Sequence, residues 1–450
     1  MADTGFDESA LNLAVARAEA VYTQRCAASR ELWKRACDVL PGGNTRTVVY
    51  YDPFPLTFVR GEGARLIDAD GHDYVDMLGD YSAGLYGHSH PVIRAAIERT
   101  LADGLTLGGL NRFEGRLAEL ILARFPSCEK IRFTNSGTEA NLMAITAARI
   151  ATKRPGVLVF DGGYHGGVFA FTSRENPVLA PFPWRFGTYN DLDATLAEIE
   201  REPDSLAAIV VEPMMGGAGA IPGDAEFLRG LRDAATKHGI ALIFDEVMTS
   251  RMGAGGIQGK LGIRPDLTTF GKYLGGGMNF GAFGGTDRFM GIFDARRGDS
   301  AIGHAGTFNN NVITMAAGVA GLSEVFTPAA AEALFERGEA LRARVNAATR
   351  ATGVPFQATG VGSIMSLHPQ DGAIRRTADL TVTPAMRKLL HLEMLARGYN
   401  FARRGYVTLS LPLADAQLDG FVAALVEVLE SVAAPLVAGQ ATPRAARARG

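Results

Sequence analysis

Apolar and polar positions alternate with a helical period at the start of the chain. Between residues 8 and 40, apolar residues such as Leu11 and Val15 recur every three or four positions, which predicts one or two amphipathic helices. An extended segment is expected at 45–51. From 56 to 77, short apolar runs separated by glycine and aspartate predict three short strands joined by tight turns, which would form a small sheet outside the main one.

Beyond residue 111, short apolar runs alternate with segments of helical period. The predicted strands lie at 131–135, 157–161, 207–212, 242–245, 266–270 and 280–285. The helices expected between or after them end near 152 or lie at 224–238 and 312–326. Alternation of this kind is typical of a mostly parallel sheet with helices on its faces, so the predicted fold class is α/β.

Pro328 interrupts the helical pattern, which resumes to about residue 351 and leads into a separate C-terminal part. The strands and helices that predict a small α+β domain there lie at 362–368, 384–397, 407–411 and 414–431. The N-terminal residues are expected to complete that domain. The predicted organisation is an N-terminal segment at 1–80, a large domain at 81–327 and a C-terminal small domain at 328–450.

The composition is that of an ordinary globular protein, with 47% hydrophobic and 21% charged residues among 450. A formal net charge of -3 gives no electrostatic reason to expect binding to nucleic acid or to an anionic membrane. The three cysteines have no Cys-x-x-Cys spacing, which argues against a disulfide framework and against a metal site. The N-terminus lacks the pattern of a secretory signal and no apolar run is long enough to span a bilayer, so a cytoplasmic location is expected.

Two predicted strands end in a carboxylate, and a third is followed by a lysine. Asp245 and Glu212 each close an apolar run, and Lys272 follows another, with three glycines shortly after it. Open α/β sheets place their ligands at the C-terminal ends of the strands. Enzymes that use pyridoxal phosphate need a lysine that forms a Schiff base and an acid that keeps the pyridine nitrogen protonated. Taken alone, each residue could equally be an ordinary strand-end aspartate or surface lysine.

A turn of small residues at 136–139 links the strand at 131–135 to the next helix. Such a turn directs free backbone N–H groups and a helix dipole towards an anion such as a phosphate, although a plain helix cap has the same signature. After the strand at 157–161, glycines flank Tyr164 and His165. An aromatic ring in that position can cover one face of a flat cofactor.

Six short motifs therefore follow one another along the chain: Asn135-Ser136-Gly137-Thr138-Glu139-Ala140, Gly163-Tyr164-His165-Gly166, Val211-Glu212-Pro213, Phe244-Asp245-Glu246-Val247, Gly271-Lys272 and Gly306-Thr307. Their order resembles that of class III pyridoxal-phosphate aminotransferases of fold type I. The resemblance extends from about residue 41 to 412. It implies a mostly parallel, seven-stranded large-domain sheet and a small α+β domain built from both termini.

The resemblance also implies a role for each motif. Lys272 would hold the cofactor covalently, and Asp245 would pair with its pyridine nitrogen. The residues that would bind the rest of the cofactor are Ser136, Gly137 and Thr138 at the phosphate, Tyr164 and Val247 on the two faces of the ring, His165 and Glu212 nearby, and Thr307 reaching the phosphate from the other subunit. The protein would be a homodimer with active sites at the subunit interface, and its substrates would be an amine or amino acid and a keto acid.

Within the class, aromatic β-amino acid (β-phenylalanine) aminotransferases and glutamate-1-semialdehyde aminomutases resemble the chain most. The aminomutases carry a loop rich in glycine and serine where this chain has the bulkier stretch 168–177, and a tryptophan tends to stand where this chain has 80–82. The β-amino acid enzymes match at 43–47 and 304–311. The chain is therefore expected to be nearer to the β-amino acid enzymes.

Arg46 and Arg404 match the positions that bind the substrate carboxylate in the β-amino acid enzymes. A guanidinium suits this task because its planar fork pairs with both carboxylate oxygens. Arg403 is the alternative to its neighbour, and a surface salt bridge is the alternative for each arginine.

The sequence thus predicts a transaminase that moves an amino group from an aromatic β-amino acid or related amine to 2-oxoglutarate or pyruvate. The alternatives are a glutamate-1-semialdehyde 2,1-aminomutase and an amine:pyruvate transaminase. A pyridoxal-fold protein that has lost catalysis is a further alternative, but it would be expected to lack Lys272 or Asp245, and both are present.

Overall fold

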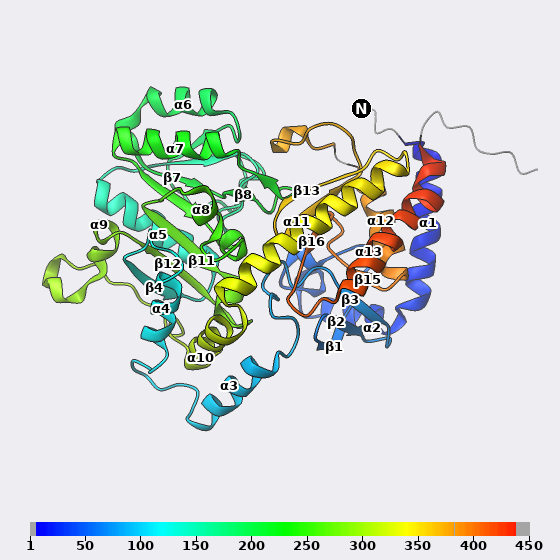
Figure 1. The fold of residues 1–450 in the computed structure, drawn as a ribbon, viewed down its shortest axis with the longest axis horizontal. Coiled ribbons are helices and arrows are strands. Elements are labelled where there is room, and N and C mark those ends of the chain that lie inside the picture. Colours follow the sequence, from blue (N-terminus) through cyan, green and yellow to red (C-terminus); the bar gives the residue numbers. More distant parts are fainter. Residues whose placement is uncertain (1–5, 382, 438–450) are drawn as a thin grey trace, which may run out of the picture.

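Seven strands form the central sheet of the larger part of the molecule, in the order β4-β12-β11-β10-β7-β5-β6 (Figure 1). The structure is a computed structural model that describes residues 6–381 and 383–437. The strands are β4 (Lys130–Thr134), β5 (Gly156–Phe160), β6 (Trp184–Gly187), β7 (Leu206–Val211), β10 (Ala241–Asp245), β11 (Leu267–Gly271) and β12 (Gly281–Gly285). Only β12 runs antiparallel to its neighbours in this sheet. The expected mostly parallel seven-stranded sheet is confirmed.

Helices pack on both faces of this sheet, which explains why its inner strands are almost wholly apolar. Helix α5 (Gly137–Thr152) packs on one face, and α6 (Leu192–Arg201) and α7 (Ala225–His238) pack on strands from the other. Successive side chains of β10 alternate between these layers. Leu242 and Phe244 join the apolar cluster that contains α7, while Ala241 and Ile243 join the cluster that contains α5.

The remaining elements of this part connect or flank the sheet. They are α3 (Pro91–Ala102), α4 (Glu114–Leu122), β8 (Met214–Met215), β9 (Ile221–Pro222), α8 (Gly256–Leu261), α9 (Asp287–Met290) and α10 (Val312–Ala320). The long helix α11 (Pro328–Ala351) then leads from this part to the other one (Figure 1).

Both ends of the chain build the smaller part. Its strands are β1 (Phe58–Glu62), β2 (Arg65–Asp68), β3 (Asp73–Asp76), β13 (Gln357–Val361), β14 (Ile364–His368), β15 (Tyr399–Asn400) and β16 (Tyr406–Thr408). Its helices are α1 (Glu8–Arg25), α2 (Ala27–Cys37), α12 (Pro384–Ala396) and α13 (Asp415–Val428). Strand β15 pairs in parallel with β3, and α12 packs on α1. The first and last segments of the described chain therefore share one core.

Two expectations differ from the structure. The segment expected to be extended at 45–51 contains a turn of 3-10 helix at Thr47–Val49, closed by bonds from the Val49 amide to the Arg46 carbonyl and from the Tyr50 amide to the Thr47 carbonyl. The strand expected at 407–411 is shorter, because beyond Thr408 the chain bonds to the loops at Ser363 and Leu85 instead of to a strand. The first five residues, on which the expectation about an N-terminal signal partly rests, lie outside the described residues.

No single helix among the described residues is long and apolar enough to cross a membrane. One pair of helices among the described residues, Val312–Val325 and Pro328–Ala351, meets the criterion when the two are counted together. The pair is bent by 75°.

Candidate active site

Adjacent strands bring Lys272 and Asp245 to one edge of the sheet. β10 and β11 run in parallel with Asp245 opposite Thr269, so Lys272, which directly follows β11, lies at the same edge. Its backbone adopts the left-handed conformation with φ 58°. Burial lowers the pKa of the Lys272 amine to about 8; the charges of Asp80 and Asp245 oppose this shift, and those of Arg46 and Arg404 add to it.

Asp245 is buried and held by three hydrogen-bond donors. Its Oδ1 accepts from the Val247 amide at 3.0 Å. Its Oδ2 accepts from Asn141 Nδ2 at 2.9 Å and lies 2.7 Å from His165 Nδ1. An ionised carboxylate offers about four acceptor positions, so this arrangement leaves one for a further donor at the strand end.

His165 is the charge partner of that carboxylate. Burial alone would lower the pKa of His165, but the hydrogen bond to Asp245 and the charges of Asp245 and Glu212 outweigh it, and the pKa is raised. The raised pKa of His165 favours its positively charged form, which pairs with the Asp245 side chain, itself only 4% exposed.

Glu212 fixes the loop that carries Tyr164. Its Oε1 accepts from the Tyr164 amide and its Oε2 from the Gly216 amide, each at 2.9 Å. Burial raises the pKa of Glu212 to about 7, with the charge of His165 acting in the opposite direction. The Tyr164 side chain is 48% exposed, so its ring is available to cover a flat ligand.

The turn before α5 caps the helix and leaves amides free. Ser136 Oγ accepts from the Glu139 amide at 3.2 Å, as the capping interpretation requires. The amides of Gly137 and Thr138 belong to the first helical turn, where no intrahelical carbonyl is available to them. Capping and anion binding are therefore compatible, because each uses different N–H groups.

Glycines bring this turn close to Val247. A methyl group added at Gly137 or at Gly271 would come within 3.0 Å of Val247, and one at Gly166 would come within 2.2 Å of Thr138 Oγ1. Only glycine allows the turn, the strand end before Lys272 and the Tyr164 loop to converge on Val247 and Thr138 so closely.

The candidate carboxylate-binding arginines converge on one aromatic ring. The guanidinium of Arg404 lies 5.2 Å from the Tyr81 ring and that of Arg46 lies 5.8 Å from it. Arg46 Nη1 pairs with Asp80 Oδ1 at 2.9 Å. Arg403, by contrast, is hydrogen-bonded to the side chain and carbonyl of Asp52. Of the two neighbouring arginines, Arg404 is the one that lies beside Arg46.

Thr307 lies in an exposed turn. The loop that contains Thr307 is joined to the residue after β4 by a hydrogen bond from Asn135 Nδ2 to Asn309 Oδ1 at 3.0 Å. A contact of Thr307 with the site of another subunit stays a prediction.

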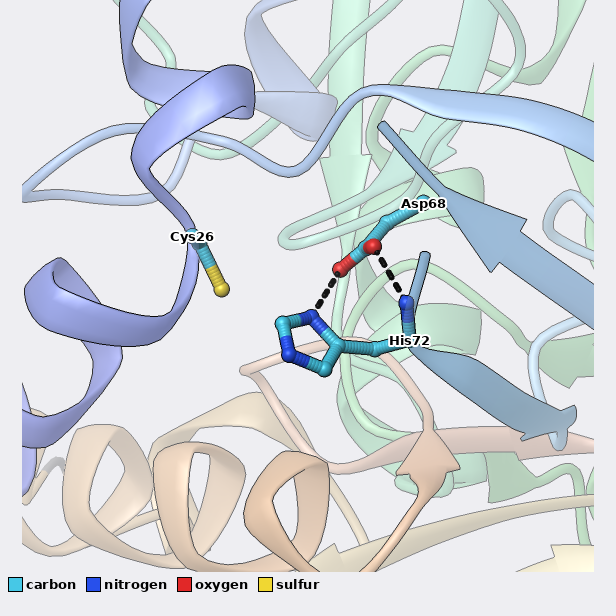
Figure 2. Close-up of side chains that lie close together, drawn as sticks. All are labelled: Cys26, Asp68 and His72. Atoms are coloured by element: carbon cyan, nitrogen blue, oxygen red, sulfur yellow. Dashed lines mark hydrogen bonds and ion pairs between the residues drawn. The ribbon is translucent and has the colours of Figure 1, made fainter. Parts of the chain in front are cut away.

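One group outside this site, among the described residues, could share a metal ion: Cys26, Asp68 and His72 (Figure 2). Asp68 Oδ2 lies 3.0 Å from His72 Nδ1 and accepts from the Tyr74 hydroxyl at 2.8 Å, while Oδ1 accepts from the amides of Asp70 and His72. Burial and the nearby carboxylates raise the pKa of Cys26 to about 12, which disfavours the thiolate that binds metals. Hydrogen bonds account for this cluster, and the expectation of no metal stays a prediction.

Comparison with known proteins assigns the family. The model of the family described as Aminotransferase class-III matches residues 47–429. The chain is 52% identical over 418 residues to beta-phenylalanine transaminase of Variovorax paradoxus, covering 93% of this chain and 96% of that protein. It is 36% identical over 414 residues to glutamate-1-semialdehyde 2,1-aminomutase of Sorangium cellulosum, covering 88% and 94%. The chain belongs to the class III aminotransferases.

Comparison with solved structures supports the same family assignment. The crystal structure of a beta-phenylalanine aminotransferase from Variovorax paradoxus matches with a TM-score of 0.93 and 51% identity, over 95% of this chain and 99% of that one. An omega-transaminase from Sphaerobacter thermophilus matches with a TM-score of 0.85 and 38% identity, over 90% and 97%. The protein is a transaminase that uses pyridoxal 5′-phosphate, and its fold is fold type I of that group, as expected from the sequence.

The described residues fit that cofactor. The free amides before α5 suit its phosphate, and the open acceptor position on Asp245 suits a protonated ring nitrogen. Asn141, which the sequence interpretation missed, connects these groups: it bonds to Asp245 and also accepts from Thr269 Oγ1 at 3.0 Å. An asparagine within a helix has no sequence signature of its own.

Replacing Lys272 by Ala is expected to remove the visible absorbance of the covalently bound cofactor, because no amine remains at the end of β11. In the wild-type apoprotein, the rate at which added pyridoxal phosphate restores that absorbance is expected to rise as the pH passes about 8, since only the neutral amine attacks a carbonyl. Lys260→Ala, at a lysine paired with Glu332, is the control and should change neither property. Unchanged absorbance in Lys272→Ala would contradict the assignment.

Proposed function

We propose that the protein transfers the amino group of an aromatic β-amino acid to a keto acid, with 2-oxoglutarate or pyruvate as acceptor. The observation that carries this proposal is the pair of arginines, Arg46 and Arg404, which both lie beside the Tyr81 ring and within electrostatic reach of Lys272. Two guanidinium groups beside an aromatic ring suit a substrate that has both a carboxylate and an aryl group. The 52% identity to a beta-phenylalanine transaminase supports the same substrate class.

In this proposal Lys272 is the group that moves protons. When bound, pyridoxal phosphate supplies an electron sink for the substrate carbon, and Asp245 maintains it by holding a positive charge at the ring nitrogen. The Nζ of Lys272 would accept the proton from the substrate carbon that bears the amine. Its lowered pKa suits this role, because a larger fraction of the amine is neutral near physiological pH.

The surrounding residues position the reactants. The amides of Gly137 and Thr138 would hold the phosphate, and Val247 and Tyr164 would contact the ring. Glu212 acts through Tyr164, because both of its carboxylate oxygens are bonded to backbone amides.

A homodimer is also part of the proposal. Six of the exposed large apolar residues lie in two segments of the chain: Leu101, Leu105, Leu107, Leu110, Ile302 and Phe308. The two segments lie side by side, since Asn310 Nδ2 donates to the Gly109 carbonyl and Asn111 Nδ2 donates to the Asn310 carbonyl. We call these six residues the apolar patch; exposed apolar residues gathered in neighbouring segments are typical of a protein interface, and Thr307 lies in the second segment. The reduced cysteines Cys26, Cys37 and Cys128 support a cytoplasmic location.

Arg404→Ala is expected to raise the KM for an aromatic β-amino acid and for 2-oxoglutarate roughly 30-fold, because removing a charged partner costs a carboxylate about 2 kcal/mol or more. A carboxylate-free arylalkyl amine should change less than about twofold. Steady-state kinetics with the three substrates measures this. Arg403→Ala is the matched control, because that neighbouring arginine is bonded to Asp52, and its KM values should stay near those of the wild type.

Equal losses for all three substrates in Arg404→Ala would show a structural role and favour the amine:pyruvate transaminase. Isomerisation of glutamate-1-semialdehyde without a keto acid would favour the aminomutase.

The dimer is tested by Leu110→Asp, since Leu110 is 89% exposed and a charge there would have to be buried at the interface. Sedimentation velocity is expected to show a monomer with weakened cofactor retention. Leu13→Asp, at an exposed leucine of α1 outside the patch, is the control and should leave the dimer intact. A Leu110→Asp variant that sediments as the wild type does would place the interface elsewhere.

A further inference from the structure

Arg46 and Arg404 differ in what neutralises them. Arg46 is paired with Asp80 by one contact, Nη1 to Oδ1 at 2.9 Å, and the two side chains are 49% and 57% exposed. No carboxylate among the described residues lies within ion-pair distance of Arg404, and its buried Nε has no hydrogen-bond partner there. Arg404 is therefore available to a substrate carboxylate, whereas Arg46 is already paired with the carboxylate of Asp80.

The backbone holds Asp80 in place at an energetic cost. Three consecutive residues other than glycine have positive φ: Asp80 at 43°, Tyr81 at 54° and Ser82 at 79°. Such values are rare, above all for a bulky residue such as tyrosine, and they persist only where the surroundings enforce them. Backbone strain of this kind is typical of functional sites, so the side chains of these three residues are candidates for a function.

Arg251 is one of the groups that enforce this conformation. Its fully buried guanidinium donates to the Ser82 carbonyl at 3.2 Å, to Ser363 Oγ at 2.9 Å and to the Leu409 carbonyl. The Tyr81 hydroxyl donates to the Val48 carbonyl at 2.8 Å, which ties the same run to the segment that carries Arg46. Both partners of the ion pair are thus held by one network.

We propose that Asp80 is a specificity-determining residue: its carboxylate occupies Arg46 until a second substrate carboxylate replaces it. A half-exposed pair with one contact is weak, so a carboxylate that pairs with the guanidinium fork through both oxygens can displace it. A substrate with one carboxylate binds at Arg404 and leaves the Asp80 pair intact. A dicarboxylate such as 2-oxoglutarate engages both arginines.

This assignment rests on the proposed function, because it refines how the same site accepts an amino donor with one carboxylate and an acceptor with two. Without Asp80, Arg46 would remain an unpaired positive charge whenever a monocarboxylate is bound. Asp80 also lies close enough to raise the pKa of the Lys272 amine, while Arg46 lowers it, so the exchange takes place within electrostatic reach of the reacting lysine.

The test compares the binding of glutarate and propionate to the holoenzyme by calorimetry, which does not depend on turnover. In Asp80→Asn the ratio of glutarate to propionate affinity is expected to rise about two- to fivefold, the worth of an exposed ion pair. Adding Arg46→Ala should abolish that gain. Asparagine and glycine tolerate positive φ, so Asp80→Gly is a second variant with the same expected result. Asp73→Asn, at a comparably exposed pair with Arg65, is the control and should leave the ratio unchanged.

A ratio that stays constant or falls in both Asp80 variants overturns the proposal, as does a gain that persists when Arg46 is removed. The proposed function fails separately. If the wild type does not transaminate aromatic β-amino acids but the ratio rises, the substrate assignment falls and the role of Asp80 stands.

Discussion

The buried carboxylate of Asp245 is the interaction on which the site depends. A charge at this depth is costly unless it is paired and hydrogen-bonded, and three donors together with the raised pKa of His165 meet that requirement. Each donor comes from a different motif: Asn141 from the helix after the phosphate turn, His165 from the tyrosine loop and Val247 from the residues after β10. Stabilising the carboxylate therefore also sets the relative positions of the groups that enclose the cofactor.

The central sheet positions Lys272 and Asp245, whereas the candidate substrate-binding residues lie in loops outside it. Asp245 ends β10 and Lys272 follows β11, two neighbouring parallel strands whose side chains pack between two helical layers, so the separation of the two residues is set by the core. The groups proposed to bind the substrate, Arg46, Asp80 and Arg404, come from loops of both chain ends that lie near Tyr81. Substrate preference can change in these loops without disturbing the sheet.

Much of the fold was predictable because parallel strands that are buried on both faces of a sheet consist of apolar residues. A charged residue directly after such an apolar run marks the end of the strand. That reasoning located Asp245, Glu212 and Lys272 correctly at the ends of β10, β7 and β11. It could not find Asn141, whose role depends on where α5 meets the sheet, or separate Arg403 from Arg404. Two-residue strands such as β15 exist only through pairing with a distant partner. A contribution of Thr307 to the site of a second subunit stays a prediction.

The most direct test of this account is the rate of the first half-reaction in Asp245→Asn, followed by stopped-flow absorbance with an aromatic β-amino acid in excess. The amide keeps the shape of the carboxylate but cannot hold a positive charge at the ring nitrogen. The account predicts that the variant retains its cofactor and that the rate falls by about two orders of magnitude. A rate equal to that of the wild type would show that the charge at the end of β10 does not support the chemistry.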